Sequence, residues 1–223
     1  MNLMFEAKEI LPQNNDWIAL VFFVSLVILV YLKMAFNERL YYTSILFFSK
    51  KNISIYFNKE KTSVFSLYQI SFFFIQFLII SLLIYTFWSN LQPSFQPFNV
   101  KTYLILLIGV VLYFVFQYFI SFFLAVIFNL EKMYKKILFE KTNYLNTLCL
   151  WLFLPLVFLT YAKNNHGFLL WATILLCVIL LIVRYILILN NNKNLFFKDL
   201  FYFILYLCAL EMAPLVIILK LTF

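Results

Sequence analysis

Glycine, histidine and charged residues are scarce in this chain. Of its 223 residues, 2 are Gly, 1 is His and 12% are charged. Soluble domains carry about 25% charged residues, so the composition excludes a soluble globular protein. The shortage of glycine excludes a glycine-rich loop that binds phosphate. The single histidine, His166, has no Cys or carboxylate beside it, which excludes an ordinary zinc site.

Cysteines and catalytic motifs are also few. The 3 cysteines, Cys149, Cys177 and Cys208, each lie inside an apolar run and form no C-x-x-C pair, so we expect them to be packing residues. The chain contains no H-E-x-x-H and no G-x-S-x-G motif. We therefore predict no catalytic, cofactor-binding or metal-binding residue and no cofactor.

Apolar residues dominate what is present. They make up 65% of the chain, with 30 Phe and 15 Tyr, and the mean hydropathy is +0.97. A helix needs about 20 apolar residues to cross a bilayer. About six stretches meet this requirement, at 17–35, 64–88, 102–128, 144–161, 168–189 and 200–219. We predict an all-α polytopic membrane helical bundle, with residues 1–223 forming a single integral membrane domain.

The basic residues predict the orientation of this bundle. The net charge is +8, but the Lys and Arg residues lie at the ends of apolar runs, which is the pattern that orients membrane helices and not that of a nucleic-acid site. Four of the 17 fall on one side, namely Lys8, Lys101, Lys163 and Lys220. The others fall on the opposite side, which we predict to be cytoplasmic in a bacterial inner membrane. Both termini then face outward, and the acidic leader before residue 17 predicts an uncleaved first span.

Two joints between the predicted spans are long enough to need an interpretation. Residues 37–63 mix aromatic side chains with a run of lysines. One interpretation is an amphipathic element on the cytoplasmic surface, with its lysines toward anionic lipid headgroups. The other is an ordinary loop folded under the bundle. Residues 129–143 are predicted to be a hydrophilic joint between antiparallel neighbours.

Two ionisable residues are predicted to lie within spans, where a charge is costly and suggests a function. Glu211 lies near the middle of the final predicted span, and Pro214 follows it and frees the carbonyl of Leu210. This acid can bind a proton, a cation or a polar group, or it can serve packing by hydrogen bonding across helices. Arg184 lies near the cytoplasmic end of its span, where its long side chain can reach the interface. A direct pair of Arg184 with Glu211 would have to bridge roughly 10 Å of depth.

Amides form a second set of polar candidates. Gln69 and Gln76 are spaced to share one face of the second predicted span. Small and polar residues recur every fourth position in the third span, at Gly109, Tyr113, Gln117, Ser121 and Ala125. Such stripes let helices approach closely and hydrogen-bond in lipid, which is the interpretation we favour. The alternative is that the glutamines and Glu211 line one polar cavity.

The last predicted span carries a family resemblance. Residues 201–220, FYFILYLCALEMAPLVIILK, with Glu211 and Pro214, resemble the C-terminal signature of an uncharacterised family of Bacteroidota integral membrane proteins, the domain of unknown function 4271. The wider layout is similar, with basic loops after the first span and before the fourth. The resemblance implies an inner-membrane location, but it implies no activity and no catalytic role for either residue.

These observations favour a non-enzymatic inner-membrane protein, such as a subunit or assembly component of an envelope complex. One alternative is a small transporter or channel that uses Glu211. Another is a lipid-modifying enzyme, which would need a second polar group close to Glu211. The expected partners are the lipid bilayer, other inner-membrane proteins and anionic headgroups at the cytoplasmic lysines, and no nucleic acid.

Overall fold

The described residues of the computed structural model are helical almost throughout. They are 16–47, 66–91, 100–127, 131–161 and 166–191. The helices are α1 (Asp16–Ala35), α2 (Asn37–Ile45), α4 (Leu67–Leu91), α5 (Val100–Ile127), α6 (Glu131–Tyr161) and α7 (His166–Asn191). No strand occurs within these ranges, so the predicted all-α fold is confirmed. The sixth predicted span, 200–219, lies outside the described residues.

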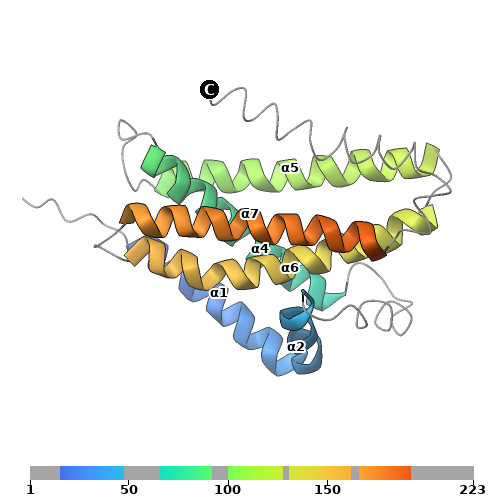
Figure 1. Cartoon of the computed structure of the whole chain (residues 1–223), viewed down its shortest axis with the longest axis horizontal. Helices are drawn as coiled ribbons and strands as arrows, with labels where there is room; N and C mark the ends of the chain where they lie inside the picture. Colours follow the sequence, from blue (N-terminus) through green and yellow to red (C-terminus); the bar gives the residue numbers. More distant parts are fainter. Residues whose placement is uncertain (1–15, 48–65, 92–99, 128–130, 162–165, 192–223) are drawn as a thin grey trace, which may run out of the picture.

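Five of these helices are long and apolar enough to cross a membrane: α1, α4, α5, α6 and α7. In Figure 1, successive long helices run in opposite directions. The end of α5, the start of α6 and the end of α7 therefore lie toward one end of the bundle. This is the alternation that short joints between spanning helices impose. The five helices lie close to five of the predicted spans, and their bounds differ by a few residues except at α6.

Helix α4 lies at the centre of the main core. Its residues Phe72, Ile75 and Ile79 recur every three or four positions and are at most 2% exposed. That spacing places them on one face of a helix. They pack in one cluster with Phe22 of α1 and Leu156 of α6. Aromatic contacts then close one end of the cluster, where the Trp17 ring lies 5.3 Å from that of Tyr85 and 5.0 Å from that of Tyr103.

Helix α6 corrects the prediction for residues 129–143. We expected a hydrophilic joint there and a span from 144 onward, but one helix of 31 residues runs from Glu131 to Tyr161. The reason is a helical pattern within the charged segment, because Tyr134, Ile137 and Glu140 all lie on a buried face that continues to Tyr144. At 1.5 Å per residue the helix is about 46 Å long, more than the roughly 30 Å of hydrocarbon.

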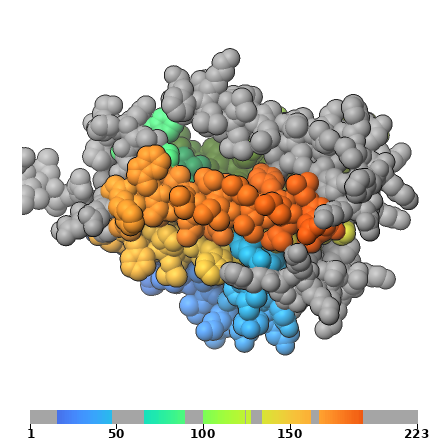
Figure 2. Space-filling view, viewed as in Figure 1, coloured from blue at the N-terminus to red at the C-terminus, as the bar shows by residue number. Residues whose placement is uncertain are grey.

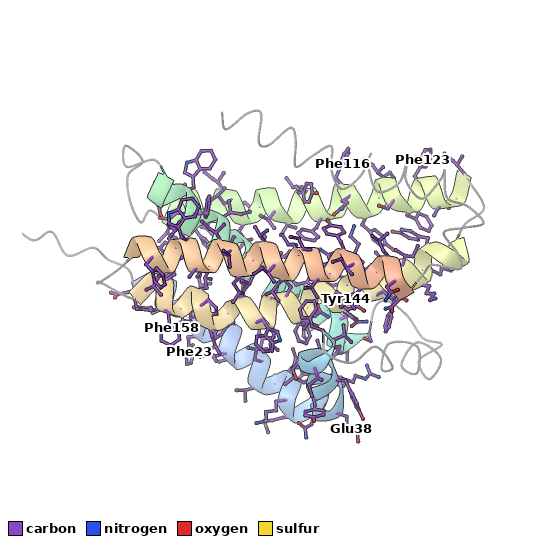
Figure 3. The ribbon with its side chains drawn as sticks, in the orientation of Figure 1. Phe23, Glu38, Phe116, Phe123, Tyr144 and Phe158 are labelled. Atoms are coloured by element: carbon purple, nitrogen blue, oxygen red, sulfur yellow. The ribbon has the colours of Figure 1, made fainter. Side chains whose placement is uncertain are left out.

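Helix α2 occupies the start of the first long joint, whose described residues end at Phe47. Residues 37–45 form a helix that packs against α1 and α6 and does not lie apart from the bundle. Residues 37–45 are therefore a helix and not an irregular loop, and contact of this helix with anionic lipid headgroups stays a prediction. Glu38 points away from the protein on its outer side (Figure 3). The rest of the joint, from 48 to 63, lies outside the described residues.

The outer faces of α5 and α7 are apolar and open. Figure 2 shows α7 across the front of the molecule, over α6, with α1 below. Of the most apolar stretch of α5 only 6% is buried, against 50% for α6. Phe116 and Phe123 of α5 are 66% and 59% exposed and point away from the bundle in Figure 3. Apolar surfaces of this kind are suited to the interior of a membrane.

Candidate functional site

The most polar part of the described interior is the interface between α4 and α6. Gln69 and Gln76 of α4 lie seven residues apart, about two turns, and so share a face as predicted. Both are buried, at 4% and 0% exposed. Asn143 and Asn146 of α6 lie opposite them, at 9% and 0% exposed. Four carboxamides are thus enclosed between two helices.

These carboxamides hydrogen-bond to one another in a continuous ladder. Gln69 Nε2 donates to Asn143 Oδ1 at 3.0 Å, and Asn146 Nδ2 donates to Gln69 Oε1 at 3.1 Å. Gln76 Nε2 donates to Asn146 Oδ1. We call Gln69, Gln76, Asn143 and Asn146 the amide ladder. Buried polar groups need such partners, because an unpaired one costs free energy in an apolar medium.

The ladder continues into helix α2 through hydroxyl groups. Thr147 Oγ1, one residue beyond Asn146, donates to the carbonyl of Thr43 in α2 at 2.8 Å. The hydroxyls of Thr43 and Tyr68 lie 2.6 Å apart and share a hydrogen bond. Thr43 is 6% exposed and Tyr68 is 3% exposed. Trp151 Nε1 also donates to the carbonyl of Ser44 at 3.2 Å. Hydrogen bonds therefore join α2, α4 and α6 in one connected network.

The chemistry of this network is that of neutral donors and acceptors. Amides and hydroxyls do not ionise near neutral pH, so they do not exchange protons as general acids or bases do. In the described ranges, no group of three or more His, Cys, Asp or Glu side chains is placed to hold a metal ion. One acceptor, Gln76 Oε1, is buried with no hydrogen-bond partner among the described residues. The arrangement suits holding helices together better than binding a charged ligand.

Arg184 of α7 contacts α6. The sequence placed its side chain within reach of the interface, but it is 5% exposed and packs against α6. Its Nη2 donates to the carbonyl of Lys141 at 3.4 Å, and its guanidinium lies 5.8 Å from the Tyr185 ring centroid. This contact fixes α7 against α6, and within the described residues no hydrogen bond joins Arg184 to the amide ladder.

A buried acid was missed by the sequence analysis. Glu140 of α6 is 2% exposed, and its Oε1 lies 4.0 Å from Lys136 Nζ one turn earlier. Nearby, Asn191 Nδ2 of α7 donates to the hydroxyl of Tyr144 at 3.0 Å. The sequence does not single out Glu140, because it predicts a hydrophilic joint at residues 129–143. The 3-to-4-residue spacing of Tyr134, Ile137 and Glu140 is the signal that could have found it.

The other predicted site residues are not joined to the ladder by any described contact. Gln117 is half-buried on α5, where its carbonyl accepts from Ser121 Oγ at 2.7 Å. Glu211 and Pro214 lie outside the described residues, so the predicted cavity shared by the glutamines and Glu211 stays a prediction. Asn143 and Asn146 were not singled out from the sequence, although their spacing from Thr147 places all three on one face of a helix.

Five long apolar helices with polar contacts enclosed between them define a multi-pass helical protein of the membrane class. The chain belongs to the family described as a domain of unknown function, DUF4271, whose sequence pattern matches residues 18–222. The resemblance inferred from residues 201–220 is therefore confirmed, and the match extends over nearly the whole chain. No curated protein and no solved structure matches it.

Proposed function

We propose that this protein is a non-enzymatic component of a membrane complex, acting as a scaffold or assembly subunit. The observation that supports this is the amide ladder, because each of its four amides is bonded to another one. Interhelical hydrogen bonds of this kind hold helices in a fixed arrangement. A substrate site would instead present polar groups that are free to bind.

The outer surface supports the same proposal. The apolar faces of α5 and α7 include large exposed side chains such as Phe119 at 66% and Trp171 at 72%. Association in lipid depends on shape and close packing, since lipid and protein are equally apolar. A rigid bundle with broad apolar faces is suited to binding other membrane helices.

The location and orientation are part of this proposal. We place the protein in the inner membrane of a Gram-negative bacterium, with the lysine-rich end in the cytoplasm, as the distribution of basic residues favours. Lysines near that end, such as Lys135, are exposed and suited to contact anionic lipid headgroups.

Site-specific photocrosslinking in living cells tests the proposal. A photoreactive residue replaces Phe119 on the open face of α5, and a matched variant carries it at the buried Leu152 of α6, which is 3% exposed. We expect the Phe119 variant to give a discrete heavier adduct containing one reproducible second protein, which copurifies in mild detergent at a fixed ratio. The opposite result has two parts. The photoreactive residue gives lipid adducts alone at Phe119 and at equivalent positions on α7, and the purified protein is a single species. This result would contradict the proposal.

A further inference from the structure

The α5 stripe at Gly109, Tyr113 and Gln117 is a packing surface that the described helices fill only in part. Toward the end of α5 the same stripe is covered, because Ser121 is 3% exposed and Ala125 is 7% exposed. At Gly109 it is open, and no described atom lies within 4 Å of where a Cβ would stand. The Gln117 side chain makes no hydrogen bond with another described residue.

The segment that follows α7 has the length and direction to fill this surface. Helix α7 ends at Asn191, toward the end of the bundle where α5 also ends (Figure 1). In the sequence, residues 192–199 include Lys193, Lys198 and Asp199, and the apolar run 200–219 that follows has enough residues to cross back. A helix that starts at this end runs antiparallel to α5. The family match includes both segments.

The depths of the two polar residues agree. Gln117 lies about 15 Å from the end of α5 at Ile127, from the rise per residue of a helix. A helix over 200–219 places Glu211 about 16 Å from residue 200 by the same measure. In antiparallel register this places Glu211 opposite Gln117, and Leu215 opposite Tyr113 one turn further on. Arg184, the other candidate for Glu211, faces α6 and lies nearer the end of the bundle.

We propose that residues 200–219 pack antiparallel along the Gly109–Gln117 stripe of α5, with Glu211 beside Gln117. The Gln117 amide donates a hydrogen bond to the Glu211 carboxyl group, which gives each polar side chain a partner inside the membrane. Gly109 then provides the close approach at the other end of the contact, as small residues do between membrane helices. Glu211 acts in this arrangement as a packing residue of the bundle.

Disulfide crosslinking of the full-length protein in membranes tests this arrangement. Cys149, Cys177 and Cys208 are first replaced by Ala, and Gln117→Cys is combined with Glu211→Cys. A second pair, Tyr113→Cys with Leu215→Cys, tests the same register if the protein with the first pair does not accumulate in the membrane. After mild oxidation and cleavage at a protease site placed within 192–199, we expect most chains to stay linked until a reductant is added.

Two matched pairs control for unspecific oxidation. Phe116→Cys with Glu211→Cys uses the neighbour of Gln117 that faces outward at 66% exposure. Gly109→Cys with Glu211→Cys uses the same stripe, but Gly109 lies about 12 Å along α5 from Gln117. We expect neither to link. Links between two chains would show that a second copy occupies the stripe. Equal linking from Phe116→Cys would show that residues 200–219 lie elsewhere, and so would the absence of a link in both test pairs. Each of these results overturns the proposal.

Discussion

Asn146 is the residue on which the amide ladder depends most. It accepts from Gln76 and donates to Gln69, while its own side chain is fully buried. Interhelical hydrogen bonds in membranes contribute on average about 0.6 kcal/mol each. We therefore expect Asn146→Leu to lower the free energy of unfolding by about 1 to 2 kcal/mol, since it removes two bonds and leaves two buried amides short of a partner. Denaturant titration in detergent micelles measures this.

Gln76 provides the comparison at the same scale. It makes one ladder bond, but its Oε1 is buried with no hydrogen-bond partner among the described residues. Replacing it by Met, which has a similar shape, loses the bond and also removes this unpaired oxygen. We expect Gln76→Met to cost less than about 0.5 kcal/mol. Equal losses for both variants would show that the two amides are not arranged as described.

At the scale of elements, helix α2 is attached to α6 by hydrogen bonds from Thr147 and Trp151, and the Thr147 bond is the shorter. Thr147 Oγ1 donates to the Thr43 carbonyl at 2.8 Å. Thr147→Val keeps the shape and removes this bond, so we expect amide hydrogen exchange in Asn37–Ile45 to become about threefold faster, the factor that corresponds to about 0.6 kcal/mol. Hydrogen-exchange mass spectrometry measures the change.

Thr142 is the matched control for this prediction. It is also buried, at 7% exposed, but its hydroxyl donates to the Leu138 carbonyl within α6 itself. Thr142→Val therefore leaves the contact with α2 intact and should not change exchange there. If both variants loosen α2 equally, the effect comes from α6 as a whole and not from the Thr147 bond.

The elements also show how far the sequence alone could lead. Apolar runs predicted α1, α4, α5 and α7 well, because an unbroken apolar run of that length is typical of a membrane-spanning helix. Helix α6 was predicted 13 residues too short, since charged residues in 131–143 lowered the hydropathy while the helical spacing continued. The shared face of Gln69 and Gln76 was predictable from their spacing. Their partners Asn143 and Asn146 were not, because which helices become neighbours depends on tertiary packing.

At the scale of the whole molecule, the distribution of basic residues predicts one orientation in the membrane. Lys33, Arg39 and Lys141 lie on the side where the sequence places most of its positive charge, and positive joints stay in the cytoplasm. Two exposed positions at opposite ends of spans test this, Glu38 on α2 and Val100 at the start of α5. Neither is a basic residue, so replacing either by Cys leaves the Lys and Arg bias unchanged.

Labelling these positions with a membrane-impermeant maleimide in spheroplasts gives the orientation directly. In a background with Cys149, Cys177 and Cys208 replaced by Ala, we expect Val100→Cys to react at once and Glu38→Cys to react only after the membrane is permeabilised. The reverse pattern would place the lysines outside, against the positive-inside rule. Reaction at both positions before permeabilisation would mean that α4, the long helix between Glu38 and Val100, does not cross the membrane. A Cys placed after residue 219 tests whether 200–219 crosses as a sixth span. A sixth crossing would make the number of crossings even and return the chain to the side on which it starts. Reaction without permeabilisation is the expected result there.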